Sequence, residues 1–170
     1  MGERLVNNPG LDLRARAAEA LARVLPMIEQ GVGDPTVSGM GYLAMVVMAP
    51  QAAVQGTSFE DAVVLEHAIG DRSAWDADYM AFARAKARLC WAHGCDGRTL
   101  LATMPHCVTP GDSLLIGAVN LDGLVVSVSG AQPWYDEAFA LAMAAMVRAL
   151  AHRDLAALAQ AGAHTAPGGT

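Results

Sequence analysis

The stretch Gly111–Ala140 constrains the fold of this chain more than any other part of the sequence. Two apolar runs, Leu114–Val119 and Leu124–Val128, flank the residues Asn-Leu-Asp-Gly, which are typical of a tight turn between antiparallel strands. A Ser-Gly pair follows the second run, and Pro133 then opens a segment with acidic residues in its first turn, as helices often do. The sequence therefore predicts a β-hairpin that leads through a glycine junction into a helix. Such a junction can present backbone N–H groups and a helix N-terminus to a small ligand.

The remaining segments predict helices that alternate with paired strands. Apolar residues recur every three to four positions in the first helical segment, where Pro26 is expected to kink the helix or end it early. Asp71 or Ser73 can cap the second long helix, and Gly94 can end it. The expected elements are a helix over 11–30, strands over Gly41–Ala49 and Ala62–Ile69, a helix over Ala74–His93, a short helix within Asp96–Met104, the hairpin, and a last helix over Pro133–Ala161.

The order of these elements favours an α/β (α+β) fold with a largely antiparallel sheet and helices on its faces. A parallel dinucleotide-binding domain would need strands that alternate singly with helices, and no GxGxxG motif follows a strand. With 170 residues, we expect a single domain over 11–162. Residues 1–10 are expected to form a flexible arm, and 163–170 a disordered tail.

Composition narrows the classes of partner. The chain is 54% hydrophobic and 16% charged, which is too apolar for a disordered protein. The net charge is −6 and the basic residues are scattered, so nucleic acid and anionic membranes are poor partners. No apolar run reaches the ~18–20 residues needed to span a bilayer, and the start does not resemble a signal peptide, so we expect a cytoplasmic protein. The low charge predicts a partner-covered surface, and hence a homo-oligomer.

Lys86 is the first candidate site residue, because it lies in the middle of an apolar stripe of the predicted helix. A lysine there either extends along its aliphatic stem to solvent, pairs structurally, or binds an anion or substrate in a pocket. Desolvation would lower the pKa of its ammonium group, and a neighbouring carboxylate would raise it. The stripe consists of Trp75, Tyr79, Phe82, Lys86, Leu89 and His93.

Acidic and aromatic residues at the start of the last helix form the second candidate group. Asp136 and Glu137 either offset the positive end of the helix dipole, or one of them faces Lys86 or a ligand as an acid–base group. Trp134 and Tyr135 either form an aromatic wall beside them or anchor the helix to the sheet.

Histidines and cysteines supply the remaining candidates. His106 lies in an irregular segment before the hairpin, where it is either a base or ligand, or a plain loop histidine. His67 follows Glu66 in a predicted strand, so alternation turns one of the two inward. The odd set Cys90, Cys95 and Cys107 argues against a disulfide framework, and its spacing does not predict a zinc site. We therefore expect no metal.

With these motifs in place, the chain resembles the GlcG/HbpS-like family, whose members include heme-binding or heme-degrading domains related to the C-terminal domain of some corrinoid adenosyltransferases. The resemblance covers roughly residues 74–150. The N-terminal half lacks the family's Asp-x-x-Gly turn with its nearby Arg. The matching motifs are Ala83-Arg84-Ala85-Lys86-Ala87, Gly117-Ala118-Val119, Val128-Ser129-Gly130 and Asp136-Glu137.

The resemblance implies a three-layer α/β/α sandwich around a mainly antiparallel sheet of four to five strands. It also implies an oligomer with ligand sites near subunit boundaries, and some members of the family bind heme. These implications are expectations for the present chain, and they add to the predictions drawn from its residues.

Three functional hypotheses follow. In the first, the protein is an enzyme of hydrolase or lyase type that acts on a small anionic metabolite, with Lys86, His106, Asp136 and Glu137 as catalytic residues. Contacts to a ligand or cofactor would then come from His67, Ser129, Gly130 and Tyr135, with N–H groups of the Ser-Gly-Ala junction completing an anion site. In the second, it binds heme without turnover through His106 or His67. In the third, it is a structural oligomer.

Overall fold

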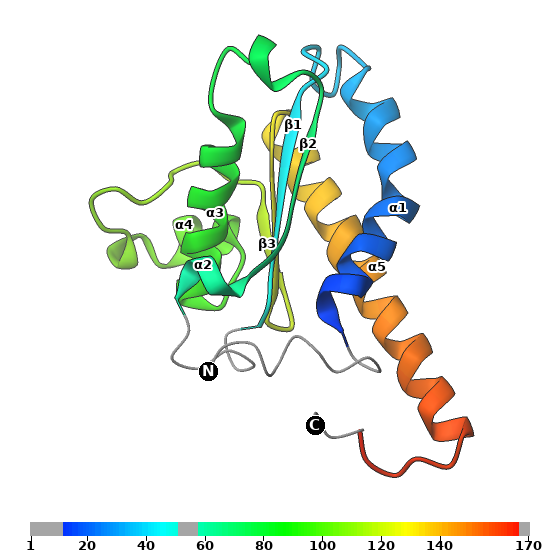
Figure 1. The fold of residues 1–170 in the computed structure, drawn as a ribbon. Helices are drawn as coiled ribbons and strands as arrows, with labels where there is room; N and C mark the ends of the chain where they lie inside the picture. Colours follow the sequence, from blue (N-terminus) through cyan, green and yellow to red (C-terminus); the bar gives the residue numbers. More distant parts are fainter. Residues whose placement is uncertain (1–11, 51–57, 167–170) are drawn as a thin grey trace.

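The computed structural model describes residues 12–50 and 58–166 and shows helices on both faces of a four-stranded sheet (Figure 1). The strands lie in the order β2-β1-β4-β3, and each neighbouring pair is antiparallel. The predicted fold class is therefore confirmed. The elements are α1 (Leu13–Val32), β1 (Leu43–Met48), α2 (Phe59–Ala62), β2 (Val63–Ile69), the 3₁₀ turn η3 (Arg72–Ala74), α3 (Tyr79–His93), α4 (Gly97–Thr103), the 3₁₀ turn η4 (Pro105–Cys107), β3 (Ala118–Leu121), β4 (Leu124–Ser129) and α5 (Pro133–Gln160).

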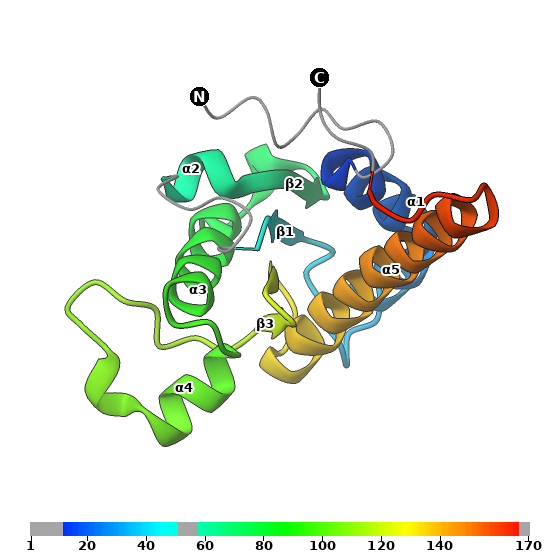
Figure 2. The ribbon, with the colours of Figure 1, turned by 90° about the horizontal axis from the view of Figure 1, so that it is seen from below.

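The sheet separates two apolar cores. Helices α1 and α5 pack on one face, and α3 with the shorter helices packs on the other (Figure 2). All six residues of β1 are buried, because this central strand contributes side chains to both cores in alternation. Met45 belongs to the core under α1 and α5, whereas Val46 belongs to the core under α3.

The register of the sheet fixes which face each residue of β4 occupies. Ser129 pairs with Ala44, and Ser127 pairs with Val46, so both serines face α3. Val128 and Val126 consequently face α1 and α5, where they lie in the larger core. The last residue of β4 thus turns its hydroxyl toward the helix that carries Lys86.

Two helix boundaries differ from the sequence-based prediction. Pro26 lies inside α1, which continues to Val32 rather than ending early. The long helix expected from Ala74 begins only at Tyr79, where the side chain of Asp78 accepts a hydrogen bond from the N–H of Ala81 at 2.9 Å. The expected capping residue Asp71 instead caps the short η3 turn through the N–H of Ser73.

The first strand of the hairpin is shorter than its apolar run. The run Leu114–Val119 predicts a strand, but β3 begins at Ala118 and Leu114 is 72% exposed. The backbone of Gly117 has φ +125°, which breaks the extended chain just before the ladder. The turn itself follows the prediction, because Asp122 and Gly123 both have the positive φ values that a tight hairpin turn needs.

The junction between β4 and α5 depends on a close backbone approach. Gly130 has φ +135°, and a Cβ atom there would lie 2.4 Å from the carbonyl oxygen of Tyr42. Only glycine fits this contact, which brings α5 directly onto the end of the sheet. Helix α5 then runs unbroken past the body of the sheet (Figure 1).

Among the described residues, no helix has both the length and the apolar character that crossing a bilayer would demand. The expected arm over 1–10 lies outside the described residues, as does the stretch 167–170 of the expected tail. Residues 163–166 follow the end of α5 without helix or strand.

Candidate functional site

The site is built around a buried ion pair between α3 and the first turn of α5. Lys86 is 2% exposed and Asp136 is 4% exposed, and the Lys86 Nζ atom lies 3.1 Å from Oδ2 of Asp136. The sequence left open whether Lys86 reaches solvent, pairs structurally or serves a pocket. In the structure its ammonium group is buried against a carboxylate and does not extend to solvent.

Lys86 also joins the ends of the hairpin strands. Its Nζ donates to the carbonyl oxygens of Val128 at 2.5 Å and of Ile116 at 3.2 Å. The N–H of Val128 donates to the carbonyl of Gly117 at 2.9 Å, and the β3–β4 ladder ends there. The lysine therefore binds carbonyl groups at the end of this ladder. An ammonium has three N–H donors, and these three acceptors use all of them.

Asp136 occupies the anion-binding geometry that the sequence predicted for a ligand. Its Oδ1 accepts a hydrogen bond from the N–H of Ala131 at 2.9 Å, and the N–H of Gly130 also donates to this carboxylate. Backbone amides after a strand form a nest for an anion, and here the resident anion is the protein's own side chain. The N–H of Gln132 is likewise engaged, because it donates to the carbonyl of Val37 at 2.8 Å.

Burial shifts the pKa values of both partners. Desolvation raises the pKa of Asp136 to about 6, while the Lys86 charge and the junction amides oppose this rise. Desolvation also lowers the pKa of Lys86, and the charge of Asp136 opposes that shift. The carboxyl group of Asp136, with its pKa of about 6, is the partner that gains a proton under mildly acidic conditions.

Gly117 makes room for the pair. A Cβ atom at this position would lie 2.7 Å from the Cβ of Asp136 and 2.8 Å from the Nζ of Lys86. Real Cβ atoms essentially never make contacts this short, so any larger residue would push the two charged side chains apart. The motif that carries Gly117 in the sequence thus has a direct steric role at the site.

A cleft of about 290 Å³ opens beside the ion pair. Ser129 and Gly130 lie in its lining with Lys86 and Asp136, so the structure brings together four of the residues expected at the site. Its walls are mainly aromatic and aliphatic. These apolar wall residues are Tyr79, Phe82, Leu115, Ile116 and Pro133.

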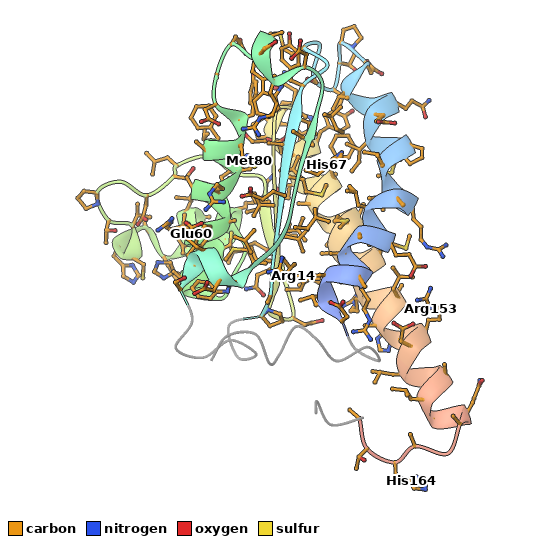
Figure 3. All side chains as sticks on the ribbon, in the orientation of Figure 1. Arg14, Glu60, His67, Met80, Arg153 and His164 are labelled. Atoms are coloured by element: carbon orange, nitrogen blue, oxygen red, sulfur yellow. The ribbon has the colours of Figure 1, made fainter. Side chains whose placement is uncertain are left out.

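Two expected contact residues face the other side of the sheet. His67 lies on β2 (Figure 3), and it pairs with Met45, whose side chain belongs to the core under α1 and α5. Tyr135 packs against the same core, with its ring centroid 6.3 Å from that of Phe139. Neither residue is among those that line the cleft.

Two expected catalytic residues also lie away from the cleft. Glu137 is one position beyond Asp136, which turns it about 100° around the helix, and its Oε2 accepts from Nε of Arg98 on α4 at 2.8 Å. His106 is exposed in the η4 turn and does not line the cleft. The structure therefore gathers Lys86 and Asp136 but neither Glu137 nor His106.

The apolar stripe on α3 is also offset from the prediction. Trp75 precedes the helix, Phe82 is 41% exposed and His93 is exposed, while Lys86 and Leu89 are buried. The face that packs on the sheet instead carries Met80, Ala83, Ala87 and Cys90. Lys86 sits at the border of this face, which explains how its stem is buried while its ammonium meets the strand ends.

The cleft does not fit heme. An axial protein ligand to iron is needed, and the two histidines proposed for this role lie elsewhere. The hydroxyl of Tyr79 in the wall donates to Asp76 at 2.7 Å, and this carboxylate raises the pKa of Tyr79 to about 12. Within 12–50 and 58–166, no three His, Cys, Asp or Glu residues are grouped so that they could hold a metal ion.

Sequence reasoning missed the cleft residues Ile116, Leu115 and Gln132. The first two belong to a run that resembles a strand, and nothing in the sequence shows that the chain bends there over a cavity. Phe82 belongs to the apolar stripe of the predicted helix, and in the structure it lines the cleft while 41% exposed.

Neither the models of known protein families nor the curated proteins match this sequence. The chemistry of the site therefore rests on its geometry.

Removing one partner of the ion pair should destabilise the protein strongly. Lys86→Met and Asp136→Leu should each lower the free energy of unfolding by about 3–5 kcal/mol, because each leaves a buried charge uncompensated. The double variant should lose less than the two single losses together. Urea denaturation measures these energies, and Arg98→Gln at the exposed Arg98–Glu137 pair is the control, for which little change is expected. Additive losses in the double variant would contradict a direct pair.

The pKa of Asp136 predicts a specific pH dependence. Its folded-state value of about 6 exceeds the ordinary value of 3.8, so the folded protein binds this proton more readily than the unfolded chain. The contribution of Asp136 to stability is thus fully present below about pH 4 and is lost as the pH rises through about 6. A ¹³C NMR titration of the Asp136 carboxyl carbon should show a midpoint near 6, and a midpoint below 4 would contradict the burial argument.

Proposed function

We propose that the protein is a small-molecule enzyme, GlcG-like in fold, that performs acid–base chemistry of hydrolase or lyase type in the cleft beside Asp136. The observation that carries this proposal is the buried carboxyl group of Asp136 in the lining of a cleft, where desolvation raises its pKa to about 6. A group that titrates near neutral pH can both accept and return a proton at the pH of the cell.

The neighbours of Asp136 suggest distinct roles. Asp136 acts as the general base, and Lys86 is a positioning residue that fixes the orientation of the carboxylate and favours its ionised form. Ser129 contributes a hydroxyl group to the cleft and supplies a hydrogen bond to the ligand. Glu137 and His106 take no part in this scheme, because the geometry does not bring them to the cleft.

The rim of the cleft supports a location near a subunit boundary in a homo-oligomer. Within residues 12–50 and 58–166, eight large hydrophobic side chains are exposed, and five of them lie in or next to the segments that form the cleft. Clustered apolar side chains on a surface favour coverage by a partner. These five are Met40, Phe82, Leu114, Leu115 and Trp134.

The test is whether chemistry depends on Asp136. The protein is incubated in D₂O with a protein-free metabolite extract of the expression host, and NMR and mass spectrometry follow the loss of compounds or their uptake of deuterium. Asp136→Asn should slow the change by about 10²–10⁴-fold, as expected for loss of a general base. With the wild type, the rate should rise as the pH increases through about 6.

Asp122→Asn is the matched control, since Asp122 lies in the hairpin turn and pairs with Arg148 at the surface. This variant should retain the wild-type rate. If the wild type changes no compound, or if Asp136→Asn is as active as the wild type, the protein is not this enzyme, and the structural-oligomer hypothesis gains support.

A further inference from the structure

We propose that the cleft binds an uncharged ligand with a flat apolar body and one hydroxyl or carbonyl group, and that it excludes organic anions. This inference rests on the proposed function only in placing the ligand beside Asp136. It also replaces the sequence-based expectation of an anionic metabolite held by Lys86.

The cationic group in the cleft has no free donor. The Nζ atom of Lys86 already donates to Asp136, Val128 and Ile116. An incoming carboxylate would have to displace one of these acceptors, and two of them are backbone carbonyls at the end of the sheet. The lysine therefore holds the fold together and leaves no donor for an anion.

The backbone amides of the junction are also occupied. Gly130 and Ala131 both donate to the carboxylate of Asp136. The carboxylate and the Lys86 ammonium 3.1 Å from it compensate each other, so an anionic ligand beside the pair would lose its hydration without gaining a counter-charge. Arg98 on α4 offers no counter-charge either, because it is paired with Glu137 and does not line the cleft. The net charge of −6 acts in the same direction at longer range.

The walls of the cleft are apolar. The rings of Tyr79 and Phe82 meet edge to face, with centroids 6.4 Å apart, and Ile116, Leu115 and Pro133 add aliphatic surface. Apolar walls of this kind favour a flat ring or a compact hydrocarbon body. Ser129 is the polar lining residue on the sheet, and the Gln132 side chain makes no capping hydrogen bond to α5. A single hydroxyl or carbonyl on the ligand matches these uncharged partners.

Benzamide and benzoate provide a direct test, because they share size and shape but differ in charge at about pH 7.5. Binding is followed by ¹H–¹⁵N NMR through the backbone amides of Gly130 and Ala131, which report on the carboxylate that they contact. Benzamide should bind at least about tenfold more tightly than benzoate, since the anion would lie unpaired beside Asp136. Equal or tighter binding of benzoate would overturn the proposal, as would the absence of saturable benzamide binding up to about 20 mM.

Variants locate the binding. Phe82→Ser and Leu115→Ser should each weaken benzamide binding several-fold, and both positions are exposed enough that folding should survive. Leu155→Ser is the control, because this leucine is 47% exposed on α5 but lies at the opposite end of the helix from the cleft. Equal effects of all three variants would show that the probe binds elsewhere, which overturns the proposal.

This outcome is separate from that of the proposed function, since benzamide binding requires no turnover. If the protein prefers benzamide but has no catalytic activity, the proposed ligand class is supported and the proposed enzymatic function is rejected. Selective benzoate binding in a protein whose chemistry depends on Asp136 would do the reverse.

Discussion

The buried ammonium group of Lys86 requires three hydrogen-bond acceptors, and the arrangement of the surrounding elements depends on supplying them. Lys86 projects from α3 at the edge of a packed face, and burial of its charge is tolerated only because Asp136 and two strand-end carbonyls surround it. These contacts tie together α3, the end of the β3–β4 hairpin and the first turn of α5. A single side chain therefore connects the sheet to helices on both of its faces.

The same interaction determines what the cleft can do. Asp136 compensates the charge of Lys86 and accepts hydrogen bonds from N–H groups of the β4–α5 junction. The part of the cleft formed by this ion pair therefore carries no net charge. The glycines at 117 and 130 permit the close approach of these elements, and neither position has room for a Cβ atom. The chemistry left to the site is thus proton transfer at one carboxyl group within largely apolar walls.

The sequence predicted the hairpin and the junction, because turn residues and helix-start signals are local, and it left a contact between Lys86 and Asp136 as one of several alternatives. It failed for residues whose role depends on which face they occupy. Glu137 and Tyr135 flank Asp136 in the sequence but point in other directions around α5. Glu137 contacts Arg98, and Tyr135 packs against the core on the opposite face of the sheet. The positions of Ile116 and Leu115 could not be predicted either, because their run resembles a strand and only the conformation of Gly117 interrupts it. Backbone acceptors for Lys86 carry no sequence signal.

The most direct test of this account is the state of the Lys86 side chain in solution, observed by ¹⁵N NMR of its Nζ atom at neutral pH. We expect a protonated ammonium whose hydrogens exchange slowly with water and show hydrogen-bond couplings to the carbonyl groups of Ile116 and Val128. Replacing Asp136 with Asn should accelerate this exchange, because the charged partner is lost. A neutral amine, or an ammonium that exchanges as fast as an exposed lysine, would contradict the central claim.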